Sequence, residues 1–223
     1  MVPFLPTTYR EEIVYMKMFA PVVKNLLEMI GQGLWGFKPK LMRDIVEQHG
    51  PLKSLAWFAQ NMPIYEKTLK QWGAIRTHLL TTEISVLNGC PYCTYGHVYA
   101  LQLHYFNARD RLMPVDEDEI VAWHAISEAD VINRFRLLIN SSGLLSELQI
   151  FERMLSLRQG IEQPISEDDH KIMHLIEMFG FLNRCGIAAK TTLDQAHDPI
   201  NKDTSLRRKY NQLRNQSPHR QLS

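Results

Sequence analysis

Two cysteines and a histidine lie close together near the middle of the chain, in a spacing that suits thiol redox chemistry. Cys90 and Cys93 form a Cys-x-x-Cys pair, and His97 follows four residues after the second cysteine. Asn88-Gly89 predicts a turn, because both residues tolerate left-handed dihedral angles. Pro91 suits the first position of a helix, where its missing N–H costs nothing. The sequence therefore predicts Cys90 at the N-cap of a helix and Cys93 in its first turn.

This placement would let the two sulfur atoms alternate between dithiol and disulfide. Inside a helix, side chains three residues apart have Cβ atoms about 5–6 Å apart, whereas a disulfide requires about 3.5–4.5 Å. An N-cap residue has non-helical dihedral angles, so Cys90 can lean toward Cys93 and shorten that distance. The positive end of a helix also lowers the pKa of a thiol. His97 lies one turn beyond Cys93, within reach of its proton.

Other interpretations of these three residues remain open at this point. Cys90, Cys93 and His97 are all residue types that bind zinc, although structural zinc sites usually have four protein ligands and the sequence has no second Cys-x-x-Cys. A structural disulfide is disfavoured, since there are three cysteines and the first residues do not read as a secretory signal. We expect redox chemistry, with no metal and no other cofactor.

The run from Thr82 to Cys93, with His97 after it, resembles the alkylhydroperoxidase D-like group of the carboxymuconolactone decarboxylase superfamily. The redox branch of that superfamily carries Ser-x-x-Asn-x-Cys-x-Tyr-Cys-x-x-x-His, and this chain matches the pattern from Ser85 to His97. The resemblance implies a thiol peroxidase in which Cys93 attacks the peroxide and Cys90 resolves the product. It also implies a hydroperoxide substrate, an external dithiol reductant, and a homo-oligomer of three or six subunits.

The chain departs from that family twice near the cysteines. The family's hydroperoxidases carry a glutamate twelve residues before the first cysteine, where this chain has His78, and a histidine where it has Tyr92. A histidine at position 78 could relay protons itself, because it titrates nearest to neutral pH. Glu83 is no simple substitute, because five helical residues turn it about 140° away from His78.

The predicted site therefore contains four catalytic residues and three residues that would line it. His104, two turns past His97, is included because it could extend the site along the same helix face. The predicted catalytic residues are Cys90, Cys93, His97 and His78, and the candidate lining residues are Tyr92, Glu83 and His104.

Composition restricts the classes of protein and partner. The 223 residues are 45% hydrophobic and 22% charged, close to the averages of folded domains. A formal net charge of +1 gives no general attraction to nucleic acid or to a membrane surface. No apolar run reaches the ~18 residues that span a bilayer. We expect neither nucleic acid nor membrane as a partner, and a reducing, cytoplasmic location.

Helical periodicity dominates the chain, which predicts an all-α multi-helical bundle. We expect one alkylhydroperoxidase D-like domain over residues 1–200, with an N-terminal helical extension, and a basic tail over 201–223. The first helix is predicted to end at Gly31, and a break at Met62-Pro63 is predicted before the helix that leads to the cysteines. Ser166 is a candidate N-cap for a late helix.

A stripe of apolar side chains near the N-terminus is larger than one surface helix needs and supports assembly with a second copy. Its residues are Leu26, Leu27, Ile30, Leu34, Trp35 and Phe37. Three functions are consistent with the sequence. The first is thiol-dependent hydroperoxide reduction, the second is a lyase of the carboxymuconolactone decarboxylase type, and the third is a non-catalytic metal-binding or assembly protein that retains the motif.

Overall fold

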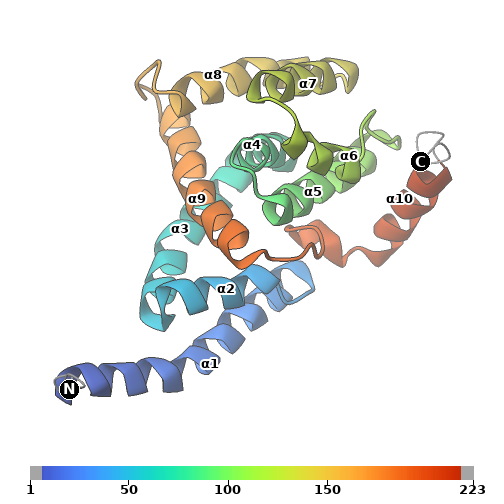
Figure 1. Ribbon diagram of the computed structural model, residues 1–223. Helices are drawn as coiled ribbons and strands as arrows, with labels where there is room; N and C mark the ends of the chain where they lie inside the picture. The colour runs from blue at the N-terminus through green and yellow to red at the C-terminus, as the bar shows by residue number, and fades with distance from the viewer. Residues whose placement is uncertain (1–6, 217–223) are drawn as a thin grey trace.

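The structure is a computed structural model that describes the backbone of residues 7–216 and the side chains of residues 19–216. It is an all-α, multi-helical bundle, as predicted, and no strand occurs within residues 7–216 (Figure 1). The α-helices are α1 (Thr7–Trp35), α2 (Lys40–His49), α3 (Pro51–Trp72), α4 (Ala74–Leu87), α5 (Pro91–Arg109), α6 (Glu117–Ala122), α7 (Glu128–Ser141), α8 (Leu148–Arg158), α9 (Glu167–Ala189) and α10 (Thr204–Gln216). Short 3-10 turns lie at η1 (Trp123–Ala125), η2 (Leu145–Glu147) and η3 (Pro199–Lys202).

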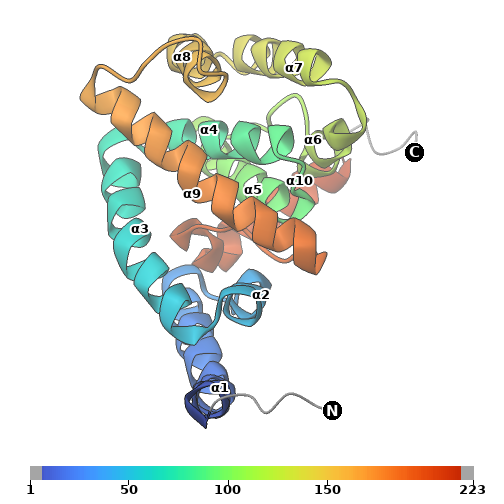
Figure 2. The same ribbon diagram turned by 60° about the vertical axis from the view of Figure 1, so that its left-hand side comes forward.

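Helices α4 and α5 form the centre of the molecule. Every residue from Thr77 to Val86 in α4 is buried, and so are most residues of α5. A helix that is buried on all sides lies inside a domain rather than on its surface. The other helices surround this pair, and α9 crosses in front of it in Figure 2. The predicted redox residues therefore belong to the two most enclosed helices.

Two predicted helix boundaries are wrong, and glycines explain both. Helix α3 continues through Pro63, and the break before α4 falls instead at Gly73, which has φ of 83°. Helix α1 continues past Gly31 to Trp35 and stops before Gly36, which has φ of 85°. The chain leaves the helix where a glycine supplies a left-handed dihedral angle, because other residues pay for that conformation.

Predicted caps are confirmed where the sequence carried a specific signal. Ser166 accepts a hydrogen bond from the backbone N–H of Asp169, and the Asp169 carboxylate accepts one from the backbone of Ser166, which completes a capping box for α9. The helix continues to Ala189, so Cys185 lies inside it. On the same helix, Gly186 lies beside Cys90, and Phe179 lines the same cavity as Cys93.

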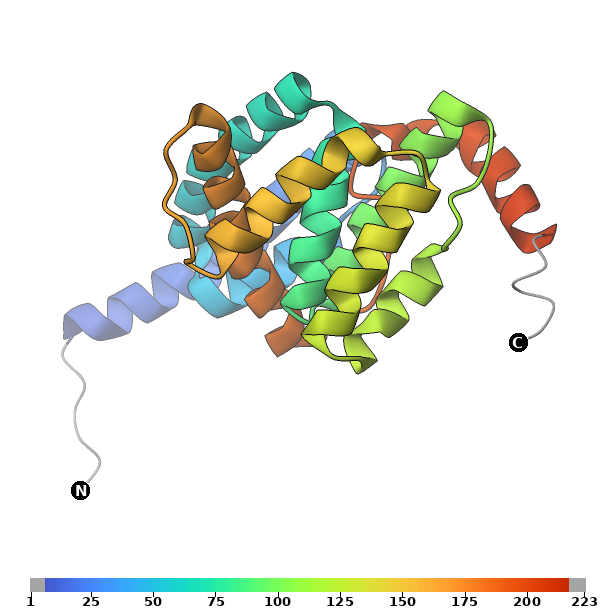
Figure 3. The same cartoon turned by 90° about the horizontal axis from the view of Figure 1, so that it is seen from above.

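The N-terminal apolar stripe is divided between the core and the surface. Leu27, Trp35 and Phe37 are buried in the core of this chain, whereas Leu26, Ile30 and Leu34 are exposed. The first turns of α1 extend away from the body, and α10 lies on the opposite side (Figure 3). Half of the stripe is thus explained by the core, and the homo-oligomer stays a prediction that rests on the exposed half.

The segment from residue 194 to residue 216 packs on the body. Tyr210 of α10 is buried and donates a hydrogen bond from its hydroxyl to Glu117 of α6, over 2.8 Å. Arg214 forms an ion pair with the same glutamate, over 3.0 Å. Between residues 7 and 216, no helix combines the length and the apolar character required to span a bilayer.

Candidate active site

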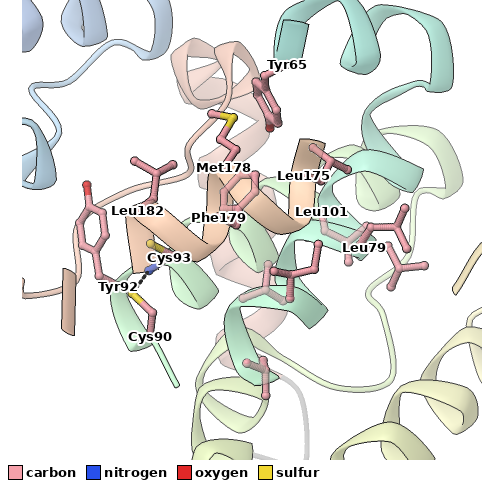
Figure 4. Close-up of a cluster of buried hydrophobic side chains, with 14 of the residues drawn as sticks. Tyr65, Leu79, Cys90, Tyr92, Cys93, Leu101, Leu175, Met178, Phe179 and Leu182 are labelled. Atoms are coloured by element: carbon pink, nitrogen blue, oxygen red, sulfur yellow. Dashed lines mark hydrogen bonds between the residues drawn. The ribbon is translucent and has the colours of Figure 1, made fainter. Parts of the chain in front are cut away.

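Cys90 is the N-cap of α5, as predicted from the turn and the proline. Gly89 has φ of 78° and turns the chain after α4. The Cys90 sulfur then accepts a hydrogen bond from the backbone N–H of Cys93, over 3.4 Å (Figure 4). Both cysteines are free thiols and are buried, with 0% and 2% of their surfaces exposed. A reactant can therefore reach them only through the interior of the site.

The two thiols have different acidities. A hydrogen bond from the Cys93 thiol lowers the pKa of Cys90 more than burial raises it, and the backbone N–H groups of Cys93 and Tyr92 lower it further. Burial raises the pKa of the Cys93 thiol well above its usual value, and the neighbouring Cys90 adds to that effect. Cys90 is thus the thiol that ionises first, and Cys93 needs a base to become a thiolate.

A small cavity of about 30 Å³ reaches Cys93. Its polar lining comes from Cys93, His97, Tyr92, His197 and Tyr65, and the rest is apolar, including Trp35 of α1. Met178, Phe179 and Leu182 of α9 supply part of the apolar lining (Figure 4). Cys90 does not line it and packs instead beside Gly186, where an added Cβ would lie 3.0 Å from the sulfur. A cavity of this size holds one or two waters, or the O–O group of a peroxide.

A chain of hydrogen bonds leads from His97 away from the cavity. His97 Nδ1 lies 3.1 Å from Nδ1 of His78, and His78 Nε2 lies 2.9 Å from Oδ2 of Asp198. The other oxygen of Asp198 lies 2.9 Å from Nε2 of His104. His97 and His78 face each other with ring centroids 5.4 Å apart. Two of the predicted residues, His78 and His104, thus contact one carboxylate that was not predicted, and His97 is linked to it through His78.

The hydrogen-bond partners of His78 and His97 determine which ring nitrogens carry the protons. A carboxylate only accepts hydrogen bonds, so Nε2–H of His78 donates to Asp198. The Nδ1 atom of His78 then has a lone pair, and it accepts a hydrogen bond from Nδ1–H of His97. Nε2 of His97 is left with a lone pair. Burial lowers the pKa of His97 well below its usual value, nearby His197 lowers it further, and the charge of Asp198 opposes both effects, so the resting imidazole is neutral.

Asp198 remains ionised although it is buried. Burial raises the pKa of its carboxyl, but the hydrogen bonds from His104 and His78 outweigh that effect and lower it overall. The backbone N–H of Ile200 also donates to this carboxylate, over 2.8 Å. A fixed negative charge at the end of the chain favours any positive charge that develops on His78 or His97.

A second histidine–carboxylate pair lies on the other side of His97. His197 Nε2 is 3.0 Å from Oδ1 of Asp194, and the Tyr92 hydroxyl donates to the other oxygen of that carboxylate, over 2.8 Å. The His197 ring fills the space above Gly96, where an added Cβ would lie 2.2 Å from the ring. The backbone N–H of His197 donates to the Gly96 carbonyl, over 3.0 Å. Gly96 thus allows the segment from Asp194 to Asp198 to lie directly on α5.

The structure brings together all the predicted site residues except Glu83. Cys90, Cys93, His97, His78, His104 and Tyr92 lie around the cavity and the hydrogen-bonded chain. Glu83 is buried elsewhere, where the charged groups that affect its pKa are Arg158, Glu152 and Arg136 of α7 and α8. Its predicted rotation away from His78 is consistent with this placement.

Three residues of the histidine–carboxylate pairs were missed, and all come from the segment after α9. Asp194, His197 and Asp198 were assigned no role, although the run Asp-x-x-His-Asp concentrates three site-type side chains in five residues. That run was the available signal. Trp35 of α1 and Tyr65 of α3 were also missed as cavity residues, because the resemblance rests on residues 82–97 and does not include them.

Comparison with known proteins gives no relative for this chain: no protein-family model, curated protein or solved structure matches it. The resemblance carried by residues 82–97 therefore stays a prediction.

Proposed function

We propose that this protein reduces hydroperoxides with the Cys90–Cys93 dithiol, as a thiol peroxidase of the alkylhydroperoxidase D type. The observation that supports this most is that Cys93 and His97 line one cavity while His97 is hydrogen-bonded, through His78, to a buried carboxylate. A thiol whose pKa is raised reacts when a neighbouring group takes its proton; in this proposal His97 does so, and Asp198 stabilises the charge that the imidazole gains.

In the first step, the Cys93 thiol gives its proton to Nε2 of His97. The thiolate attacks the nearer peroxide oxygen, the O–O bond breaks, and Cys93 becomes a sulfenic acid. His97 returns the proton to the departing alkoxide, which leaves as an alcohol. Asp198 stabilises the transient positive charge on the imidazoles through His78.

In the second step, the sulfur of Cys90 attacks the sulfenic sulfur of Cys93. A disulfide forms, and hydroxide leaves with the proton of Cys90 as water. The lowered pKa of Cys90 favours this step, because the thiolate is the nucleophile. An external dithiol, which supplies two electrons and two protons, then restores both thiols by exchange.

In this proposal, two residues of the histidine chain together do what the single glutamate does in the family's hydroperoxidases. His78 occupies the position of that glutamate, and the carboxylate is supplied from far along the sequence by Asp198. The proposal extends to an intracellular, reducing location, which keeps the resting dithiol reduced.

Peptide mapping after reaction with one equivalent of hydroperoxide tests the proposal. Trypsin cleaves after Arg76 and Arg109, so residues 77–109 hold both Cys90 and Cys93, whereas Cys185 follows Arg184 and falls in another peptide. We expect the first peptide to lose two hydrogens and Cys185 to stay alkylatable. Two alkylatable thiols in residues 77–109 after oxidation would refute the proposed chemistry.

A further inference from the structure

Side chains from three parts of the chain converge beside the thiol site. His78 comes from α4, His104 from α5 and Asp198 from the segment after α9, and their ligand atoms all lie within 4.8 Å of one another. Both histidines present Nε2 to the carboxylate, each 2.9 Å from a different oxygen. His78 and Asp198 are buried, with 0% and 4% of their side chains exposed.

We propose that His78, His104 and Asp198 bind one divalent first-row transition ion such as Zn²⁺. Two imidazoles and one carboxylate form a donor set that suits zinc, iron, cobalt or nickel, and not Mg²⁺ or Ca²⁺. Ligand atoms around a tetrahedral ion with metal–nitrogen bonds of about 2.1 Å lie about 3.4 Å apart. The two observed nitrogen–oxygen separations of 2.9 Å involve different oxygens of Asp198, and the three ligand atoms lie within 4.8 Å of one another, so side-chain rotation must bring all three to one ion.

An ion at this position would also have access and an open coordination site. The His104 side chain is 25% exposed, so the cluster meets solvent on the α5 side. Three protein ligands leave the fourth position of a tetrahedral ion for water or another small ligand.

Neighbouring groups already orient two of the three ligands. His78 is held at Nδ1 by His97, over 3.1 Å, and Asp198 accepts the backbone N–H of Ile200, over 2.8 Å. Hydrogen bonds of this kind fix the ring orientation and the tautomer of metal-binding histidines.

Metal binding would reverse the tautomers of the histidine chain. An ion that binds Nε2 of His78 displaces the proton from that nitrogen and uses its lone pair. His78 must then carry its proton on Nδ1 and donate it in a hydrogen bond to Nδ1 of His97. His97 then carries its own proton on Nε2 and has no lone pair for the proton of Cys93. This consequence rests on the proposed function: the ion-loaded protein would react slowly with peroxide and the ion-free protein quickly.

Titration with Co²⁺ and Zn²⁺ tests the binding site separately from the thiol chemistry. The probe protein is the full chain with Cys90→Ser, Cys93→Ser and Cys185→Ser, which removes thiolate ligands. We expect one Co²⁺ per chain, a visible spectrum without the intense near-ultraviolet band of cobalt–thiolate bonds, and displacement by Zn²⁺. His104→Gln and Asp198→Asn in this background should weaken binding at least about tenfold.

A matched histidine variant and a measurement on the unmodified ligands complete the test. His170→Gln changes an exposed histidine of α9 and should leave the affinity unchanged. Proton NMR of the Co²⁺ form should show two strongly shifted, exchangeable imidazole N–H signals, one from each ligand histidine. This measurement uses a protein in which His78 and His104 are not substituted.

Three results would overturn the site. The first is that the cysteine-free chain shows no saturable binding of Co²⁺ or Zn²⁺. The second is that His104→Gln and His170→Gln bind the ion with equal affinity, and the third is that binding requires the cysteines. The regulatory consequence has its own readout: if the ion binds but peroxide oxidises the wild-type dithiol equally fast with and without Zn²⁺, the tautomer reversal is wrong and the binding site stands. If the dithiol does not react at all, the proposed function fails and the binding data are unaffected.

Discussion

The two sides of α4 bury ionisable groups in opposite ways. His78 lies against a carboxylate and two other histidines, so each of its ring nitrogens has a partner. Glu83, five residues later, is equally buried, and both of its carboxylate oxygens lack a hydrogen-bond partner within the part of the chain that the structure describes. Burial raises the pKa of Glu83 well above its usual value, which favours the neutral acid.

The difference shows that burial of a titratable group does not by itself mark a reaction site. A buried group can take part in proton transfer when its neighbours can accept or stabilise the charge that the transfer creates. His78 has Asp198 for this purpose, whereas Glu83 lies away from the thiols and the cavity. Since Glu83→Gln changes the same helix at the same depth, it is the matched control for every substitution on the His78 side.

The largest expected effect comes from the thiols. Cys93→Ser should abolish peroxide consumption, because no nucleophile remains on the cavity. Cys90→Ser should allow one attack and then stop at a Cys93 sulfenic acid, which dimedone labels. Peroxide consumption and mass spectrometry of the labelled protein check both outcomes, with Glu83→Gln expected to turn over like wild type. A dimedone adduct on Cys90 in Cys93→Ser, with none in Cys90→Ser, would reverse the proposed roles.

The next effect concerns the base. His97→Ala should slow the reaction with peroxide by about 10²-fold, the usual value of general acid–base assistance. Asp198→Asn should slow it less, since it weakens only the support of His78, and Asp198→Glu should restore part of the rate. Stopped-flow measurement of thiol oxidation in wild type, these variants and Glu83→Gln checks the order. Equal rates in His97→Ala and wild type would leave His97 with a packing role.

The sequence predicts the local parts of this site better than the contacts between residues that are far apart in the sequence. The Gly89 turn, the Cys90 N-cap and the Ser166 cap depend on residues within a few positions, and all three are observed. The contact between His78 and Asp198 joins residues 120 positions apart, and no local pattern encodes it. The break at Gly73 was missed because Pro63 is the stronger helix breaker in isolated sequence, although α3 accommodates it.

A smaller effect is expected at the glycine that admits the Asp194–Asp198 segment. Gly96→Ala places a methyl group 2.2 Å from the His197 ring, so the segment must move away from α5. We expect a loss of about 1–3 kcal/mol in the free energy of unfolding, the usual cost of overpacking, together with slower peroxide reaction as Asp198 leaves His78. Urea unfolding measures the first quantity. The control is Gly33→Ala, where an added Cβ meets nothing within 4 Å; equal stability of the two variants would contradict the close packing of His197.

The smallest effect on chemistry, and the sharpest contrast between the two sides of α4, is expected from Glu83→Gln. Because burial raises the pKa of Glu83 in the folded protein, the folded state keeps a proton that the unfolded state loses above about pH 4. Stability is therefore full below the unfolded pKa and falls as pH rises toward the folded pKa, by about 1.4 kcal/mol per pH unit. Glutamine resembles the protonated acid and does not titrate, so the variant should match wild type near pH 4 and exceed it at pH 7. Thermal unfolding of both proteins at the two pH values measures this, and a variant that is less stable at pH 7 would mean that Glu83 is ionised and stabilised in the folded chain.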